Sequence, residues 1–164
     1  SLNEYAYQLS KGKKPEEVLK EMRFSNRDNG RTPMQWDASP NAGFTTGTPW
    51  IAINANYVNR NVALQEKDPE SCLNHFRAMT RLRREHKVLV YGKYTLLDAD
   101  NANVYAYTRE LNGKKLLVLL NFSGEDAPTA HGLDVMGSRV LINNYKEANS
   151  EVLKPFQAVI FEMK

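Results

Sequence analysis

Apolar and polar positions follow a helical period in the first half of the chain and alternate in the second half. The spacing predicts a short helix over residues 2–9 and a second helix that begins at Pro15. Proline at a first helical position, followed by the carboxylates of Glu16 and Glu17, is typical of a helix start, because the first N–H has no partner there and the helix dipole favours negative charge.

Residues 24–61 follow neither period, and prolines and glycines interrupt them repeatedly. The segment nevertheless carries large apolar side chains, which disordered segments avoid. They are Met34, Trp36, Phe44, Trp50, Ile51, Ile53 and Tyr57. We therefore expect a long ordered loop, packed on a scaffold through these apolar anchors and locked at Pro33 and Trp36, and ordered loops of this kind often display binding groups.

A third helix is predicted to begin with Asp68 as its N-cap and Pro69 in its first turn, and to run to Lys87. Apolar residues recur along one side at helical spacing, which predicts a face buried against the rest of the protein. This face consists of Cys72, Leu73, Phe76, Met79 and Leu82.

After Lys87 the pattern changes to strict alternation, which is typical of strands with one buried face. Strands are expected over residues 91–97, 104–111, 115–121, 138–144 and 158–163. Asn112-Gly113 between two of them predicts a tight hairpin. A β unit of this size has a marginal core by itself, so we expect it to pack on the preceding helix.

Composition adds that the chain is a soluble globular type, with 41% hydrophobic and 25% charged residues. A net charge of +3 is too small to indicate nucleic-acid binding, and the basic side chains at the end of the third helix are interpreted as a solvated face. No apolar run approaches the ~20 residues of a membrane span. The first residues show no export signal and no initiator Met, and Cys72 has no disulfide partner, so we expect a cytoplasmic protein and a chain that continues upstream.

Several kinds of catalytic or cofactor site are disfavoured by the motifs. His75, His86 and His131 do not have metal-ligand spacing, so no metal site is expected. The serine-hydrolase elbow and the glycine-rich phosphate loops are missing from the sequence, so no nucleotide or other cofactor is assigned.

The chemistry of the long loop is concentrated in residues 25–37, which hold two arginines, two aspartates and the side-chain amides of Asn26, Asn29 and Gln35. Fixed planar donors of this kind suit sugar hydroxyls. The alternative is an Arg–Asp network that only braces the loop. The residue types alone favour neither reading over the other.

A family resemblance runs through the same loop. Residues 27–37, 41–45, 49–51, 54–57 and 61–62 resemble the α-glucosidase and oligo-1,6-glucosidase branch of the α-amylase family of glycoside hydrolases. Residues 81–83 and 116–122 are similar to the last barrel helix and the C-terminal β domain of that branch. Essentially the whole chain takes part in the resemblance.

The resemblance implies an α+β fragment. Residues 1–90 would form the end of a catalytic (β/α)8 barrel, with the loop after strand 8 and the last helix, and residues 91–164 an antiparallel β-sandwich that, with them, packs on the missing N-terminal barrel. It also implies that Arg31 hydrogen-bonds the terminal glucosyl unit of a short oligosaccharide, with Arg27 as the second candidate. Phe44 and Trp50 are expected to be packing residues rather than sugar platforms.

Catalysis in that branch uses an aspartate nucleophile, a glutamate acid/base and a further aspartate, all of which precede the eighth barrel strand and so lie upstream of this chain. The resemblance therefore assigns no catalytic role to Asp28, Asp37, Asp98 or Asp100, and we expect the chain alone to be inactive. A trehalose-phosphate hydrolase or a glucosyl isomerase of the same family also fits. A stand-alone carbohydrate-binding module over residues 91–164 is the alternative from another class, and the alternating pattern shows no exposed aromatic row for it.

Overall fold

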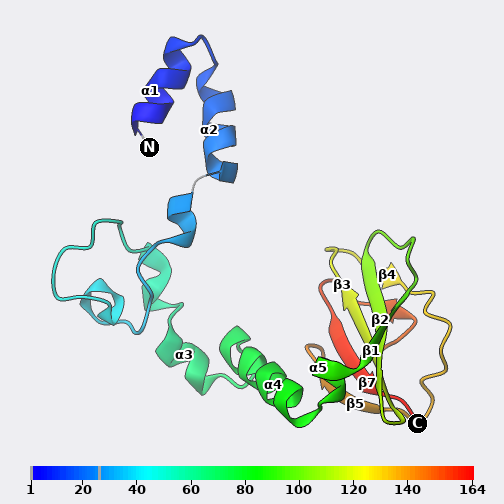
Figure 1. The fold of residues 1–164 in the computed structure, drawn as a ribbon. Coiled ribbons are helices and arrows are strands. Elements are labelled where there is room, and N and C mark those ends of the chain that lie inside the picture. Colours follow the sequence, from blue (N-terminus) through cyan, green and yellow to red (C-terminus); the bar gives the residue numbers. More distant parts are fainter. Residues whose placement is uncertain (1, 26) are drawn as a thin grey trace. The chain divides into compact units, whose positions relative to one another are not determined.

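The computed structural model describes residues 2–25 and 27–164, and divides the chain after Lys67 into two compact units (Figure 1). We refer to them as the N-terminal unit and the C-terminal unit. In the described ranges no helix is long and apolar enough to cross a membrane.

The N-terminal unit opens with the two predicted helices, α1 (Leu2–Ser10) and α2 (Pro15–Ser25), which contact one another. Val18 of α2 is fully buried. Short helical turns follow within the long loop. They are η1 (Arg27–Gly30), η2 (Pro40–Gly43) and η3 (Ala55–Val58), and the short helix α3 (Val62–Lys67) follows the loop.

The third predicted helix is present as α4 (Cys72–Glu85), but its start differs from the prediction. Ser71 is the N-cap, and its hydroxyl accepts the Asn74 N–H at 3.2 Å. The Asp68 carboxylate instead accepts the Glu70 N–H at 2.9 Å, which makes Asp68 part of the turn before the helix. The helix also ends before Lys87, because His86 is extended, and a separate short helix, α5 (Val88–Tyr91), follows.

The predicted buried face of α4 is largely exposed, which corrects the expectation from its pattern. Phe76 is 66% exposed and Met79 38%, and Cys72 is exposed as well. Leu73 and Leu82 alone among the five predicted residues are partly buried. The amphipathic pattern predicts a face suited to a partner, and the described residues do not supply that partner for the first turns of α4.

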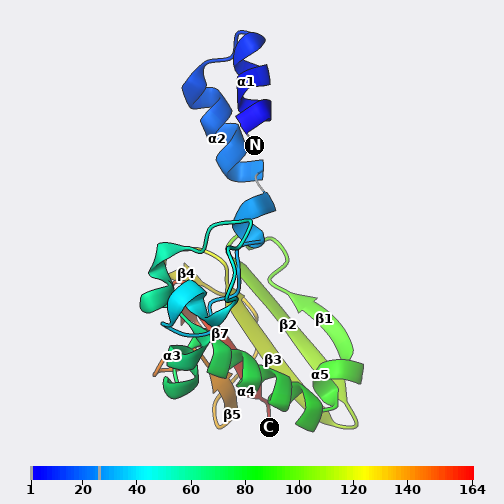
Figure 2. The ribbon, with the colours of Figure 1, turned by 90° about the vertical axis from the view of Figure 1, so that its left-hand side faces the viewer.

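Each of the five predicted strands is present in one antiparallel sheet, with the strand order β1-β2-β3-β7-β5 (Figure 2). The strands are β1 (Lys93–Leu97), β2 (Val104–Leu111), β3 (Lys114–Asn121), β5 (Arg139–Asn143) and β7 (Ala158–Glu162). A separate pair, β4 (Ala127–Pro128) with β6 (Val152–Leu153), is not predicted, because two residues cannot display a period. Asn112 and Gly113 both have positive φ, as a type I′ hairpin turn requires, which confirms the hairpin between β2 and β3.

The core of the C-terminal unit lies on both faces of the central strand β3. Leu117 and Leu119 on one face cluster with Ala127 of β4 and Leu153 of β6. On the other face Leu116, Val118 and Ile160 are buried, and further residues cover them. These are Val88 of α5, with Leu82 of α4 and Leu89 packed against the cluster. The expectation that the β unit packs on the preceding helical segment is therefore confirmed.

Asn121 is a buried polar side chain that organises the loops at one end of the sheet. Its Nδ2 donates to the carbonyl oxygens of Glu125 at 2.7 Å and Lys154 at 2.9 Å, and its Oδ1 accepts the Ser123 N–H at 2.8 Å. Ser123 and Glu125 follow β3, and Lys154 precedes β7. The Asn121 side chain therefore joins the end of β3 to the segment that leads into β7.

Replacing Asn121 by Ala is expected to destabilise the chain, because a buried carbonyl that loses its donor costs about 1–3 kcal/mol. Urea denaturation of the 164-residue chain measures the effect. Asn149→Ala is the matched control, since Asn149 is an exposed turn asparagine that accepts the Glu151 N–H. An equal loss in the two variants would show that Asn121 is an ordinary turn residue.

Candidate functional site

Arg27 and Arg31, the predicted substrate-binding residues, lie in one turn directly after α2. Arg27 opens η1, and the Arg31 N–H donates to the carbonyl oxygen of Asp28 at 3.0 Å, so the two arginines flank the same turn. Both side chains are exposed. Asn26 and the side chain of Asn29 lie outside the described part of the structure. The turn thus presents two guanidinium groups to solvent.

Residues 35–37 form the backbone centre of the loop. On one side the N–H groups of Trp36 and Asp37 donate to the carbonyl oxygen of Ala42, at 2.8 and 3.3 Å. On the other side Val62 N–H donates to the Gln35 carbonyl and Ala63 N–H to the Trp36 carbonyl, both at 2.9 Å. This segment therefore joins η2 to the start of α3.

Gln35, one of the three amides proposed for sugar recognition, is a structural brace. Its Nε2 donates to Asn56 Oδ1 at 3.0 Å and to the carbonyl oxygen of Arg60. Both partners lie more than twenty residues away along the chain. Its amide donor is therefore used within the loop, which favours the bracing alternative for this residue.

Two asparagines that the motif analysis did not single out hold other parts of the loop. Asn41 Nδ2 donates to the carbonyl oxygens of Thr45 and Gly47, at 3.1 and 3.0 Å. Asn61 is buried and caps α3, because its Oδ1 accepts the Leu64 N–H at 2.9 Å. The sequence signal for Asn41 is its position between Pro40 and Gly43, where an asparagine side chain substitutes for backbone partners.

The turn at η2 has an unusual backbone. Asn41, Ala42 and Gly43 follow one another with φ values of 54°, 56° and 66°. A Cβ added to Gly43 would lie 2.8 Å from the Asp37 carboxylate, so this position requires glycine for space as well as for φ. The Asp37 carboxylate accepts the N–H of Ser39 at 2.8 Å and also the Ser39 hydroxyl. These two bonds lower the pKa of Asp37.

Four of the seven large apolar side chains predicted to anchor the loop are exposed, while Ile51, Ile53 and Tyr57 are partly buried. Trp36 is 50% exposed and Trp50 87%, and Met34 and Phe44 are also exposed. The turn is locked through the backbone of Trp36 rather than through its ring, so the loop is ordered by hydrogen bonds to the chain itself. Among the described residues of the loop, the rings of Trp36 and Phe44 are about half covered and that of Trp50 is almost fully exposed.

The carboxylates of Asp37 in this loop and of Asp98 in the C-terminal unit are engaged by donors of their own segments. Asp37 is engaged by Ser39, and Asp98 accepts bonds from the side chain of Asn101 at 2.7 Å and from Ala130 N–H at 2.9 Å.

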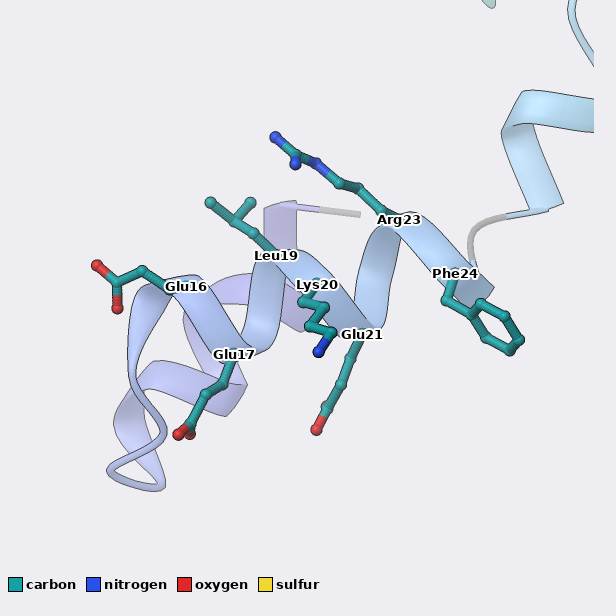
Figure 3. Close-up of a pocket in the computed structure, with 7 residues that line it drawn as sticks. All are labelled: Glu16, Glu17, Leu19, Lys20, Glu21, Arg23 and Phe24. Carbon is teal, nitrogen blue, oxygen red and sulfur yellow. The ribbon is translucent and has the colours of Figure 1, made fainter. Parts of the chain in front are cut away.

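An open hollow along α2 contains Glu16 and Glu17, but its seven side chains project from one helix in different directions (Figure 3). Throughout residues 2–25 and 27–164, no three acidic, histidine or cysteine side chains gather as a metal site would require.

Comparison with known proteins connects this loop to a catalytic domain. The sequence pattern described as "Alpha amylase, catalytic domain" matches residues 2–92, which include the whole loop and both helices α4 and α5. The chain belongs to the α-amylase family. The resemblance inferred from the loop motifs is thereby confirmed, and this chain aligns over its full length with an oligo-1,6-glucosidase.

Three α-amylase family relatives show how much of a protein the chain represents. An oligo-1,6-glucosidase from Parageobacillus thermoglucosidasius is 39% identical over 100% of this chain and 31% of its own length. The crystal structure of a trehalose-6-phosphate hydrolase from Bacillus licheniformis matches with a TM-score of 0.89 and 34% identity, over 99% of this chain and 31% of that one. An isomaltulose synthase from Klebsiella sp. LX3 matches with a TM-score of 0.82 and 36% identity, over 97% and 30%. The chain spans about a third of the length of these relatives.

Acid is expected to loosen the Asp37 turn. The pKa of Asp37 is lower in the folded chain than its unfolded value of 3.8, so its contribution to stability is complete above that value and is lost as the pH falls through the lowered pKa. Trp36 fluorescence, followed from neutral to strongly acidic pH in a Trp50→Phe background, should report a transition that Asp37→Asn removes. Asp100→Asn is the charge-matched control, and an acid transition that persists in Asp37→Asn would contradict this assignment.

Proposed function

We propose that the chain is the C-terminal part of a retaining α-glucosidase of the oligo-1,6-glucosidase type, which releases terminal glucose from short α-glucosides. The observation that carries the proposal is the 39% identity to an oligo-1,6-glucosidase over the entire chain, including the loop that holds Arg27 and Arg31. The intact protein would take a small oligosaccharide as substrate.

The fold proposal divides the chain at residues 90 and 91. Residues 1–90 would be the end of a (β/α)8 barrel, with the loop after strand 8 and α4 as the last barrel helix, and residues 91–164 a β-sandwich domain. Support comes from the catalytic-domain match, which ends at residue 92, and from the β4–β6 pair, which contributes Ala127 and Leu153 to the core on one face of the larger sheet. Loops that follow barrel strands form the active site in this architecture.

Arg31 is proposed as the substrate-binding residue, with Arg27 as the alternative. A guanidinium group presents several N–H donors in a fixed plane, which suits paired hydroxyl oxygens of a glucosyl unit. Arg31 is exposed and follows a turn whose backbone is closed by its own N–H. The loop beyond it is braced by Gln35 and Asn41, so the arginine would be held in position before a sugar arrives.

The catalytic carboxylates are proposed to lie in the upstream part of the barrel. A retaining mechanism needs a nucleophile and an acid/base about 5–5.5 Å apart on opposite sides of the glycosidic bond. Asp37 and Asp98 are instead occupied by backbone and side-chain donors of their own turns. We infer that this chain contributes recognition of the sugar while bond cleavage depends on residues that precede it.

The upstream barrel would also cover the exposed apolar side of α4. Cys72, Phe76 and Met79 lie on one side of this helix at the spacing of a packing face, and in the described chain all three are exposed. Their exposure is consistent with a helix that contacts neighbouring barrel helices.

We also propose that the enzyme is cytoplasmic. The single cysteine of this chain, Cys72, supports this proposal, because no disulfide within the chain contributes to its stability.

Arg31→Ala in the full-length enzyme is expected to lower kcat/KM for every glucosyl substrate. The loss of charge-assisted hydrogen bonds, each about 1.5–3 kcal/mol, corresponds to roughly ten- to a hundred-fold. Steady-state kinetics on isomaltose and on a nitrophenyl α-glucoside measure it. Arg60→Ala, which removes another exposed arginine of the same loop, serves as control, and a large loss in Arg27→Ala with an unchanged Arg31→Ala would move the role to Arg27.

The substrate is tested by offering isomaltose, trehalose 6-phosphate and sucrose to the full-length enzyme. Hydrolysis of isomaltose in preference to the others is the expected result. Preference for trehalose 6-phosphate is the second candidate, favoured by the TM-score of 0.89 to the Bacillus licheniformis hydrolase, and rearrangement of sucrose would indicate an isomerase. The 164-residue chain alone should show no turnover, and turnover by this chain would contradict the upstream location of the catalytic carboxylates.

A further inference from the structure

The turn between β2 and β3 places the side chain of an asparagine next to the backbone nitrogen of a glycine at the surface. Asn112 and Gly113 form this two-residue turn with φ values of 50° and 77°, and both residues are exposed. Leu111 pairs with Lys114 as the last pair of the ladder. The turn therefore projects beyond the hydrogen-bonded part of the sheet, where local opening requires the least free energy.

The Asn112 amide is not held by other groups. In the described part of the chain, no hydrogen bond joins the Asn112 side chain or the Gly113 N–H to another residue. Asparagines of other turns are held in place. Asn149, for example, accepts the N–H groups of Glu151 at 2.8 Å and Val152 at 3.2 Å through its Oδ1. The Asn112 side chain can therefore rotate until its amide carbon faces the Gly113 nitrogen.

The surroundings of Gly113 are open on the side where a side chain would project. A Cβ added at this position would meet no atom within 4 Å. Because glycine has no Cβ, its nitrogen is less hindered than that of a residue with a side chain when it attacks a neighbouring carbonyl carbon. A five-membered ring closed between Asn112 and Gly113 therefore has room at this turn.

We propose that Asn112 is a site of spontaneous deamidation, a covalent modification for which water is the only co-reactant. The Gly113 N–H loses its proton to a base in the solvent, and the nitrogen attacks Cγ of the Asn112 amide. A bond forms between this nitrogen and Cγ, the bond from Cγ to Nδ2 breaks, and Nδ2 takes up a proton and leaves as ammonia. Water then opens the resulting succinimide ring. Over both steps an amide and water become a carboxylic acid and ammonia, with no change of oxidation state.

The carbonyl at which water opens the ring decides what becomes of the hairpin. Opening at Cγ gives aspartate, and since aspartate followed by glycine also favours a type I′ turn, this product keeps the hairpin and lowers the net charge from +3 by one. Opening at the main-chain carbonyl gives isoaspartate, whose backbone runs through Cβ and Cγ and is one atom longer. The Leu111–Lys114 pair then no longer closes. Leu116 to Leu119 are at most 2% exposed, so the change stays confined to the tip.

Ageing of the full-length enzyme tests the proposal. The folded enzyme is held in mildly alkaline buffer for several weeks, digested with trypsin and analysed by mass spectrometry. The peptide of residues 110–114, which carries Asn112, should exchange NH2 for OH several-fold faster than the peptide of residues 147–164, which carries Asn149. Asn149 is the matched control, because it is also exposed, precedes a serine and has a bonded side chain. Asn29-Gly30 falls in a separate peptide, residues 28–31, and does not interfere.

A variant and a second digestion identify the route of the reaction. Gly113→Asn introduces a residue that tolerates positive φ and adds a Cβ beside the attacking nitrogen, so deamidation of Asn112 should fall several-fold. An aspartate-specific protease cleaves the aspartate product and not the isoaspartate product. Both products are expected in the aged enzyme, because the succinimide can open at either carbonyl.

Several results would overturn the proposal. Equal rates at Asn112 and Asn149 in the folded enzyme would show that the turn gives Asn112 no special reactivity. Deamidation of Asn112 in urea without deamidation in the folded enzyme would show that the closed turn protects the amide. An unchanged rate in Gly113→Asn, or aspartate as the sole product, would indicate direct hydrolysis without a ring. None of these measurements depends on which substrate the enzyme hydrolyses, so failure here leaves the proposed function in place.

Discussion

Burial of β3 on both faces is the constraint on which the C-terminal unit depends. Its consecutive residues Leu116 to Leu119 are at most 2% exposed, so the strand needs a cover on each side of the sheet. The β4–β6 pair contributes to one cover and α5 to the other. Burying a leucine side chain stabilises the fold by about 1.5–3 kcal/mol. If one face of the sheet were open, the β3 residues on that face would lose this stabilisation. The short connection from α4 into β1 therefore belongs to the core.

The long loop of the N-terminal unit is stabilised in a different way. Its order comes from amide side chains and backbone groups that find partners within the loop, as the contacts of Gln35, Asn41 and Asn61 show. Each of these amides satisfies backbone carbonyls or N–H groups that an irregular segment cannot pair by itself. The ring of Trp36 is half exposed and that of Trp50 87% exposed, so these polar contacts order the loop without burying its two tryptophan rings.

Sequence patterns predicted the parts of this fold that rest on repetition. Alternation located the strands of the main sheet, and Asn112-Gly113 identified a hairpin whose turn demands positive φ. The start of α4 was misplaced because Asp68-Pro69 and Ser71 both satisfy the chemistry of a helix start, and local sequence does not decide between them. The motif correctly placed Arg27 and Arg31 at one turn, but it could not show that Gln35 is a brace, since its partners lie far along the chain.

The three successive left-handed residues at 41–43 make the η2 turn dependent on the bonds around it. Left-handed conformations cost non-glycine residues about 1–3 kcal/mol each, so Asn41 and Ala42 do not adopt them unaided in a free chain. The bonds of Ser39 to Asp37, and those of the Trp36 segment to Ala42 and α3, offset this cost in the folded loop. Because the closed turn depends on these few bonds, we expect native-state amide exchange there to proceed through local fluctuation while the sheet stays intact.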